Sequence, residues 1–357
     1  MTNYYIAIVI MTVMMLVVML LLIADNKSLS KPIQQGFMFV AILIIIAVIS
    51  EFLGVLLNGS GSETRILHIF VKFVELSIAP AIPIICGMAV FPTKYKWLPI
   101  TLIAINLSLE LFSAFFGIVY YVDLNNIYHH STWYWLYYLA YSFGTIYLLI
   151  HVYRFSSKYQ NQKNICLAMI MVFIFSGIIT QAIDSSLRIV WLSVASGFSL
   201  FYIYYTDLIL RIDSLTGLLN RGAYERKLEN LKGNITFLFF DIDHFKLIND
   251  KQGHRIGDEC LVKIALEIRH SFSHIGLCYR YGGDEFCVIT NHKVNNIEEY
   301  ISSYLQHTDQ TRKNEYPNLP YISIGYADYN PGDKIDDIIS RADKMMYEYK
   351  QQHHSQA

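Results

Sequence analysis

Arg280-Tyr281-Gly282-Gly283-Asp284-Glu285-Phe286 sets two carboxylates directly after two glycines, in the C-terminal part of a chain of 357 residues. Apolar residues at 275–279 and 286–289 flank this stretch and predict two short buried strands, joined by a Gly-Gly hairpin turn. Acids at such a turn stand at a sheet edge, where a cation or a phosphate can reach them, and glycines let a ligand approach the backbone. A hairpin with solvated acids would contain the same residues, so the turn alone leaves both interpretations open.

A second segment favours the chemical interpretation. The apolar, β-prone run 236–240 ends abruptly in Asp241-Ile242-Asp243. Mg²⁺ prefers oxygen ligands in octahedral geometry, usually one or two carboxylates together with substrate phosphates. Asp241 at a strand end and Asp284 or Glu285 at the hairpin would supply such carboxylates, although a strand end with solvated acids remains the alternative.

Several motifs in a fixed order resemble the GGDEF-domain diguanylate cyclases, and the resemblance covers roughly residues 211 to 350. The matching segments are 213–221 (DSLTGLLNR), 241–246 (DIDHFK), Asn249-Asp250, Gly253-His254, Gly257-Asp258, 280–286, 323–327 (SIGYA) and 341–347 (RADKMMY). A lone Gly-Gly-Asp-Glu-Phe would be a weak signal, whereas this series at matching spacing is highly specific.

The C-terminal part alternates predicted helices and strands, which indicates an α+β domain with a mostly antiparallel sheet. We expect helices at 222–231, 257–270, 297–306 and 335–350, and strands at 236–242 and 321–326 besides the hairpin. The resemblance implies the same fold, similar to nucleotide cyclase and polymerase palm domains.

The resemblance implies that two GTP molecules are condensed into cyclic di-GMP with release of pyrophosphate. Asp241, the Ile242 carbonyl and Asp284 would hold Mg²⁺, and Glu285 would assist a second metal position. Asp284 would also act as, or near, the general base. Lys246 would stabilise charge that develops on the phosphates, unless it is an ordinary surface lysine.

The resemblance also implies residues that bind the rest of the nucleotide. Asp258, with Asn249 beside it, would accept hydrogen bonds from guanine, and an acid in a first helical turn also suits the helix dipole. His254 would line the same guanine-binding site, or it would have no role in binding. Lys350 matches a phosphate-contacting lysine of the family, but the Gly-Arg-Asn-like continuation is missing and 351–354 reads QQHH.

One regulatory motif of the family is absent. Many members carry an Arg-x-x-Asp product-inhibition site whose Asp lies six residues before the first glycine of the signature. Here that window reads Ser273-His274-Ile275-Gly276, so we expect weak inhibition by the product.

The N-terminal part has the composition of a membrane region. The chain is 54% hydrophobic with a mean hydropathy of +0.34, which is too apolar for an ordinary soluble enzyme. Residues 1–205 hold only 10 of the 28 Lys and Arg and 7 of the 29 Asp and Glu, and nothing is basic enough for a nucleic-acid surface. We predict an all-α transmembrane bundle of seven spans at 4–24, 36–57, 66–91, 97–121, 131–153, 165–183 and 187–209.

Basic residues in the loops predict the orientation of these spans. Loops 25–35, 92–96 and 154–164 carry two or three Lys or Arg each, whereas the alternate loops carry one at most. This bias places the N-terminus outside and the C-terminal domain in the cytosol, where GTP is found. Localisation in the plasma or inner membrane follows.

Four ionisable residues fall within the predicted spans: Glu51, Lys72, Glu75 and Glu110. Lys72 and Glu75 are three residues apart and face the same side of a helix, so they would pair. Structural pairing between helices and a buried pocket for a small ligand are both open, and the stimulus is not readable from the sequence.

We therefore predict a sensory and anchoring domain at 1–209 and a cyclase domain at 210–357, with no flexible linker between them. A product with two halves, made by domains with one GTP site each, predicts a homodimer through the cytosolic domains. The alternatives are a catalytically weak GTP-binding signalling module, and a membrane part that is a transporter or receptor in its own right.

Overall fold

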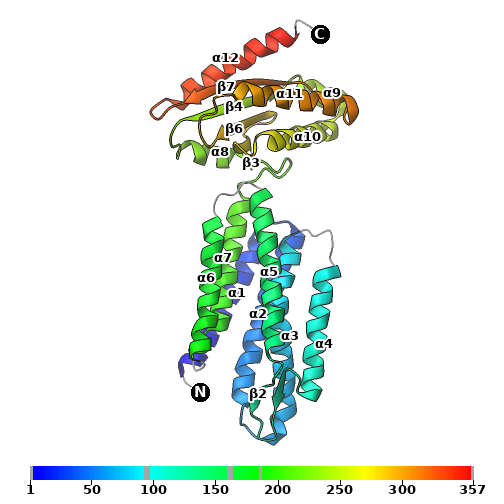
Figure 1. Cartoon of the computed structure of the whole chain (residues 1–357), viewed down its shortest axis with the longest axis vertical. Helices are drawn as coiled ribbons and strands as arrows, with labels where there is room; N and C mark the ends of the chain where they lie inside the picture. The colour runs from blue at the N-terminus through cyan, green and yellow to red at the C-terminus, as the bar shows by residue number, and fades with distance from the viewer. Residues whose placement is uncertain (1–2, 92–96, 159–163, 185–186, 355–357) are drawn as a thin grey trace. The chain divides into compact units, whose positions relative to one another are not determined.

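The computed structural model describes residues 3–91, 97–158, 164–184 and 187–354 (Figure 1). Its contacts divide the chain into two compact units, Met1–Asp207 and Leu208–Ala357. The N-terminal unit is helical, and the C-terminal unit combines a sheet with helices.

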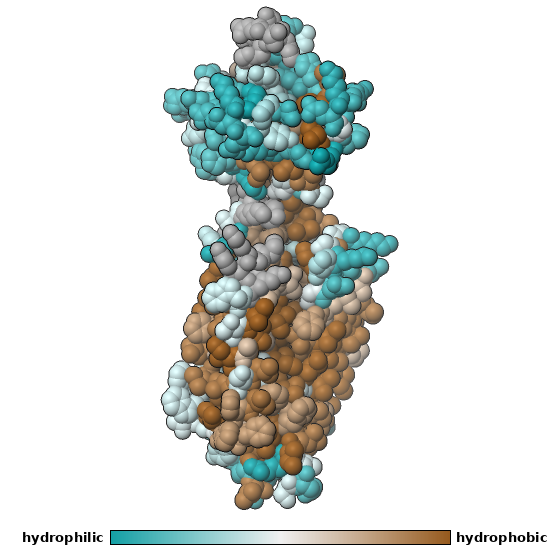
Figure 2. Space-filling view, turned by 90° about the vertical axis from the view of Figure 1, so that its right-hand side faces the viewer, coloured by the Kyte–Doolittle hydropathy of each residue, from teal (hydrophilic) through white to brown (hydrophobic). Residues whose placement is uncertain are grey.

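Seven long helices make up most of the described N-terminal unit: α1 (Asn3–Asp25), α2 (Lys31–Leu57), α3 (Arg65–Val90), α4 (Trp97–Phe116), α5 (Trp135–Lys158), α6 (Asn164–Ile183) and α7 (Val190–Ile209). Five helices, α1 to α5, are long and apolar enough to cross a membrane, with α3 counted from Ser62, and a shorter apolar helix covers Ala168–Gln181. Large apolar side chains are exposed along them, and the face in Figure 2 is mostly hydrophobic. The helical region is thus observed, with five qualifying helices where seven spans are predicted.

The N-terminal unit is not purely helical, which corrects the all-α prediction. Helix α4 ends at Phe116, and a hairpin of β1 (Tyr120–Val122) and β2 (Tyr128–His130) follows. Asn126 lies in the turn of this hairpin with a φ of 60°. Its side chain makes hydrogen bonds with five surrounding groups, one of which is the His68 ring. The basic loop at 92–96 and residues 159–163 of the loop at 154–164 lie outside the described residues.

Buried charges in this unit are mostly paired. Lys72 Nζ lies 2.7 Å from Glu75 Oε2, as the spacing predicts. Glu51 accepts from the Tyr5 hydroxyl at 3.0 Å and lies 3.9 Å from Arg188. Structural pairing therefore accounts for these residues, whereas both carboxylate oxygens of Glu110 are buried without a hydrogen-bond partner among the described residues.

The C-terminal unit contains a five-stranded sheet in the order β3-β5-β6-β4-β7. The strands are β3 (Leu219–Asn220), β4 (Ile235–Ile242), β5 (Gly276–Arg280), β6 (Glu285–Thr290) and β7 (Ile322–Tyr329). The helices are α8 (Arg221–Leu228), α9 (Phe245–Gln252), α10 (His254–Phe272), α11 (Ile297–Asn314) and α12 (Ile335–His354). All pairings are antiparallel except β3 with β5.

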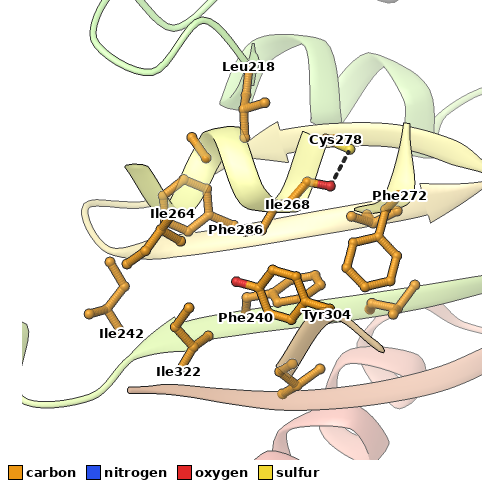
Figure 3. Close-up of a cluster of buried hydrophobic side chains, with 14 of the residues drawn as sticks. Leu218, Phe240, Ile242, Ile264, Ile268, Phe272, Cys278, Phe286, Tyr304 and Ile322 are labelled. Carbon is orange, nitrogen blue, oxygen red and sulfur yellow. Dashed lines mark hydrogen bonds between the residues drawn. The ribbon is translucent and has the colours of Figure 1, made fainter. Parts of the chain in front are cut away.

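Both faces of the sheet are covered because β4 is apolar on both sides. Leu238 and Phe240 point to one face, where α10 and α11 pack. Phe237 and Phe239 alternate to the other face, where α8 and α12 pack. Figure 3 shows the first cluster, in which the rings of Phe240, Phe272 and Tyr304 contact one another at centroid distances of 5.4 to 5.6 Å. This strand, which is buried from Ile235 to Phe240, ends at the candidate site.

The predicted elements of this unit are present, with shifted ends. The helix expected from 257 begins at His254, and the one expected to end at 306 continues to Asn314. The expected strand at 321–326 runs from Ile322 to Tyr329. Helix α9, between Asp243 and Gly253, is an element that the sequence pattern did not predict.

Candidate active site

The site begins at the end of the interior strand β4. Asp241 is paired across the ladder with Glu285 of β6 on one side and with Ser323 of β7 on the other. Every residue of β4 before it is buried, whereas Asp241 is half-buried. A strand held by two neighbours therefore fixes the position of this carboxylate.

The hairpin between β5 and β6 delivers the next two carboxylates. The amides of Tyr281 and Gly282 donate to the Glu285 carbonyl at 3.2 and 3.4 Å. Neither Gly282 nor Gly283 has a positive φ, so the turn does not need glycine for its backbone conformation. A Cβ on Gly282 would lie 2.1 Å from Glu285 Oε2, and the space beside Gly283 is open. The glycines thus provide room for a carboxylate and for a ligand.

Arg280 fixes this turn through hydrogen bonds from its guanidinium group. Its Nε and Nη2 atoms donate to the Gly283 carbonyl at 3.1 and 2.8 Å, and Nη1 donates to Asp213 at 3.1 Å. Asp213 also accepts from the Thr216 amide and hydroxyl at 2.8 and 2.6 Å. Asp213 and Arg280 thus form a clamp that fixes the hairpin turn to the segment beginning at Asp213.

Helix α12 places Lys350 over the strand end. Its ammonium contacts Asp241 and lies 3.6 Å from Asp243, which accepts from Ser323 Oγ at 2.8 Å. The helix packs closely on β7 because Gly325 has no side chain; a Cβ there would lie 2.1 Å from the Ala342 carbonyl. Burial acts to lower the pKa of Lys350, but the hydrogen bond and charge of Asp241 outweigh it and the pKa is raised.

The carboxylates repel one another. Burial and then the Asp241 charge raise the pKa of Asp284. Burial, followed by the charges of Asp284, Asp241 and Asp343, raises the pKa of Glu285. Burial and Asp241 likewise raise the pKa of Asp343 on α12. A cation bound among these groups would relieve the repulsion.

The residues predicted to bind the nucleotide lie on the helices that follow β4. Lys246 is exposed in the first turn of α9, and His254 is exposed at the start of α10. Gly257 brings α9 against α10, since a Cβ on it would lie 2.0 Å from Asn249 Oδ1. Asp258, the next residue, is exposed beside this contact.

The structure thus brings together Asp241, the hairpin acids and Lys350, and separately brings Asn249 to Gly257-Asp258. No hydrogen bond or ion pair among the described residues joins the two groups. Nor do these residues contain a preformed cluster of three or more His, Cys, Asp or Glu for a metal ion. The predicted ligands Asp241, Ile242, Asp284 and Glu285 therefore form an incomplete site by themselves.

Asp343 and Arg280 belong to this region, although the sequence assigned neither a role. Asp343 and Lys350 are seven residues apart, which puts them on one face of a helix two turns apart. From this spacing to Lys350, the sequence could have identified Asp343 as a residue of the site. The double role of Arg280 had no such signal, because Asp213 is 67 positions away in the sequence.

The C-terminal part of the chain is similar to known proteins. Residues 210–356 match the family model described as "Diguanylate cyclase, GGDEF domain". The chain is 31% identical over 147 residues to diguanylate cyclase VdcA of Vibrio cholerae, covering 39% of this chain and 43% of that protein. It is 32% identical over 171 residues to diguanylate cyclase DgcZ of Escherichia coli, covering 45% and 57%. The chain therefore spans about half the length of these curated relatives.

Among solved structures, the coiled coil and GGDEF domain of DgcB from Caulobacter crescentus, in complex with c-di-GMP, is 25% identical. The TM-score is 0.38, and the match covers 45% of this chain and 92% of that chain.

Proposed function

We propose that this chain, whose residues 210–356 are a GGDEF domain related to diguanylate cyclases, is a membrane-anchored diguanylate cyclase. It would condense two GTP molecules into cyclic di-GMP with release of two pyrophosphates. The observation that carries the proposal is the meeting of Asp241, Glu285 and Lys350 at one sheet edge, next to an open turn that bears Asp284.

A divalent cation, Mg²⁺ in our proposal, fits this donor set. Asp241, the Ile242 carbonyl, Asp284 and Glu285 offer hard oxygen atoms. Burial and then the charges of neighbouring carboxylates raise the pKa values of Asp284 and Glu285, and a bound cation would offset the repulsion between these charges. When bound, such a cation would neutralise charge on the phosphates. Lys350 is the cation that contacts Asp241 in the described structure.

Each chemical role is assigned to a residue of this chain. Asp284 would take the proton of the attacking 3′-hydroxyl. Lys246 and Lys350 would contact the phosphates, and Lys246 is exposed with no ion pair to another described residue. Asn249 and Asp258, with His254 at the edge, would bind guanine.

The proposal extends to the membrane and to a second copy. The exposed apolar side chains of the N-terminal helices need a nonpolar environment, which a lipid bilayer supplies. We infer seven spans, since α6 and α7 have 20 residues each and are long enough to cross a bilayer. The Lys and Arg bias of the loops then places the N-terminus outside. One GTP per domain implies that two domains face each other in a C₂ homodimer.

The assignment of the site is tested by comparing variants of the purified full chain for cyclic di-GMP formation from GTP. Asp284→Ala should abolish product formation, while Asp336→Ala, an exposed carboxylate on α12, should leave it unchanged. Activity of Asp284→Ala within about tenfold of the wild type, roughly 1.4 kcal/mol of barrier, would contradict the role of Asp284. Retained GTP binding without any turnover in the wild type would favour the signalling-module alternative.

A further inference from the structure

The ammonium group of Lys350 lies against two carboxylates at the end of β4. It contacts Asp241, a proposed ligand of the cation, and its Nζ atom lies 3.6 Å from Oδ1 of Asp243. The side chains of Asp241 and Asp243 are 21% and 8% exposed, so both carboxylates are largely shielded from water. Asp243 has no role in the mechanism proposed above, although it is the more buried of the two.

Asp243 is held in place by the strand β7 and the residue before it. Its Oδ1 atom accepts from Ser323 Oγ at 2.8 Å, and its amide donates to the Tyr321 carbonyl at 3.0 Å. Ser323 is fully buried and stands opposite Asp241 in the sheet. The sheet therefore fixes both carboxylates beside the same ammonium group.

Lys350 has a fixed helix and a movable side chain. Helix α12 packs on β7 through the close approach of Ala342 to Gly325. The Lys350 side chain is 32% exposed, and a lysine carries its charge on a flexible stem of four carbons. The ammonium can therefore move between neighbouring acceptors while the helix stays in place.

A divalent cation on Asp241 would repel the ammonium of Lys350. At equal distance a divalent cation attracts a carboxylate twice as strongly as an ammonium does, because the Coulomb energy is proportional to the charge. Mg²⁺ also prefers carboxylate oxygens as ligands. The cation is thus the stronger partner for Asp241, and Asp243 is the acceptor that remains for Lys350.

We propose that Lys350 and the cation compete for Asp241, and that Asp243 is a positioning residue that retains Lys350 when the cation binds. Retained there, the ammonium stays available to a phosphate that the cation holds. The inference rests on the proposed function, because Asp241 is a cation ligand only in that proposal. Its tests use neither GTP nor turnover, so the two can fail separately.

Cation binding to variants of the full chain in a nonionic detergent tests the competition. Mn²⁺, as a probe for Mg²⁺, is titrated without nucleotide, and the free ion is measured by electron paramagnetic resonance. Lys350→Met should bind Mn²⁺ about fivefold or more tightly than the wild type, because it removes the competing charge. Lys344→Met, an exposed lysine of the same helix, is the matched control and should stay within about twofold. Equal or weaker binding by Lys350→Met would overturn the proposal.

The reciprocal effect is measured on the wild type, so it does not depend on the folding of a variant. Lysines are labelled with a trace of acetic anhydride, and mass spectrometry compares Lys350 with Lys344. A cation that is weakened by the Lys350 contact must weaken that contact in turn, so Mn²⁺ should raise the relative labelling of Lys350 about twofold or more. Labelling of Lys350 that does not respond to Mn²⁺ would contradict the competition.

Asp243→Asn tests the retaining role, because it keeps the shape of the side chain and removes its charge. Mn²⁺ should raise the labelling of Lys350 more in this variant than in the wild type, since the displaced ammonium has lost its second acceptor. An equal rise in both proteins would mean that Asp243 is only structural. If the variant does not fold, Ser323→Ala, which removes the hydrogen bond to Asp243, takes its place with the same expectation.

The outcomes separate this inference from the proposed function. Turnover of GTP by the wild type, with unchanged Mn²⁺ affinity in Lys350→Met, would overturn the competition and leave the cyclase assignment standing. Tighter Mn²⁺ binding by Lys350→Met, in a chain that does not turn over GTP, would support the competition and contradict the cyclase assignment. No Mn²⁺ binding by either protein would overturn the competition together with the cation site.

Discussion

Arg280 and Asp213 are joined by a hydrogen bond of 3.1 Å between Nη1 and Oδ1, and the same guanidinium holds the Gly283 carbonyl. Both side chains are largely buried. The hairpin turn that bears Asp284 is therefore tied to the segment that follows helix α7. The shape of the site depends on a contact between residues far apart in the chain.

We predict that this clamp stabilises the C-terminal unit. Arg280→Lys should lower its free energy of unfolding by about 1–2 kcal/mol, because one ammonium cannot donate to both acceptors as the planar guanidinium does. Asp213→Asn should have a similar effect, and the double variant should lose less than the sum. Urea unfolding of a fragment of residues 208–357 measures all three.

Glu225→Gln is the control for this series. Glu225 pairs with Arg221 at 2.8 Å, but both side chains are mostly exposed. Such a pair contributes about 0.5 kcal/mol or less. Strictly additive losses at Arg280 and Asp213 would show that the two residues act independently.

The second prediction concerns pH. The pKa of Asp284 is raised above 3.8, so the folded chain binds this proton more tightly than the unfolded chain does. The resulting stability is present below pH 3.8 and is lost as the pH rises through the raised pKa. Without divalent cation, Asp284→Asn should therefore melt at a higher temperature than the wild type at pH 7, and the difference should vanish near pH 4.

Added Mg²⁺ should reverse this order at pH 7, because it would stabilise the wild type and not the variant. Thermal unfolding at several pH values, with and without Mg²⁺, measures the effect. Asp336→Asn should not raise the melting temperature. A wild type that is already the more stable protein at pH 7 without cation would contradict the repulsion among the carboxylates.

Product inhibition should be weak. Gly276 stands where the inhibitory motif of the family has its Asp, and a Cβ there would lie 2.5 Å from the Ile289 carbonyl. The backbone of this chain therefore leaves no room for the acidic side chain. Titration of cyclic di-GMP into a steady-state assay measures inhibition, and a submicromolar inhibition constant would reveal a site elsewhere.

The fourth prediction concerns coupling through α7. This helix ends at Ile209, and Asn220 Nδ2 donates to the Leu210 carbonyl directly after it. Each residue inserted between Ile209 and Leu210 should turn the helix by about 100°. One or two inserted residues should change activity in membranes strongly, and four should restore it in part.

The same insertions near Gly233, where a side chain would have open space, are the control. They should leave activity nearly constant. A flat response at both places would mean that α7 is a tether and that the membrane unit only anchors the cyclase domain.

The sequence predicted most of the C-terminal fold because its signals are local. The run before Asp241 is apolar on both faces, and β4 is accordingly an interior strand of the sheet with helices on both sides. Helix α9 is short and contains Asn249 and Asp250, so it lacked a clear apolar period. The hairpin β1–β2 was not predicted, because the predicted span 97–121 covered the first two residues of β1 and β2 lay in the short loop before the next predicted span.

The candidate site was predicted as a set of residues and not as a geometry. Sequence spacing indicated the acids at two strand ends, but the contact of Lys350 with Asp241 depends on how closely α12 packs on β7. The clamp by Arg280 and the unpartnered oxygens of Glu110 depend on tertiary packing in the same way. Such contacts join distant parts of the chain and leave no periodic signal.

The most direct test of the central claim is the stoichiometry of the reaction. The purified full chain is incubated with GTP and Mg²⁺, and nucleotides and pyrophosphate are quantified by chromatography and mass spectrometry. Our account predicts one cyclic di-GMP and two pyrophosphates for every two GTP consumed, with none formed by Asp284→Ala. GTP that is bound and recovered unchanged, under conditions where a known diguanylate cyclase turns over, would contradict it.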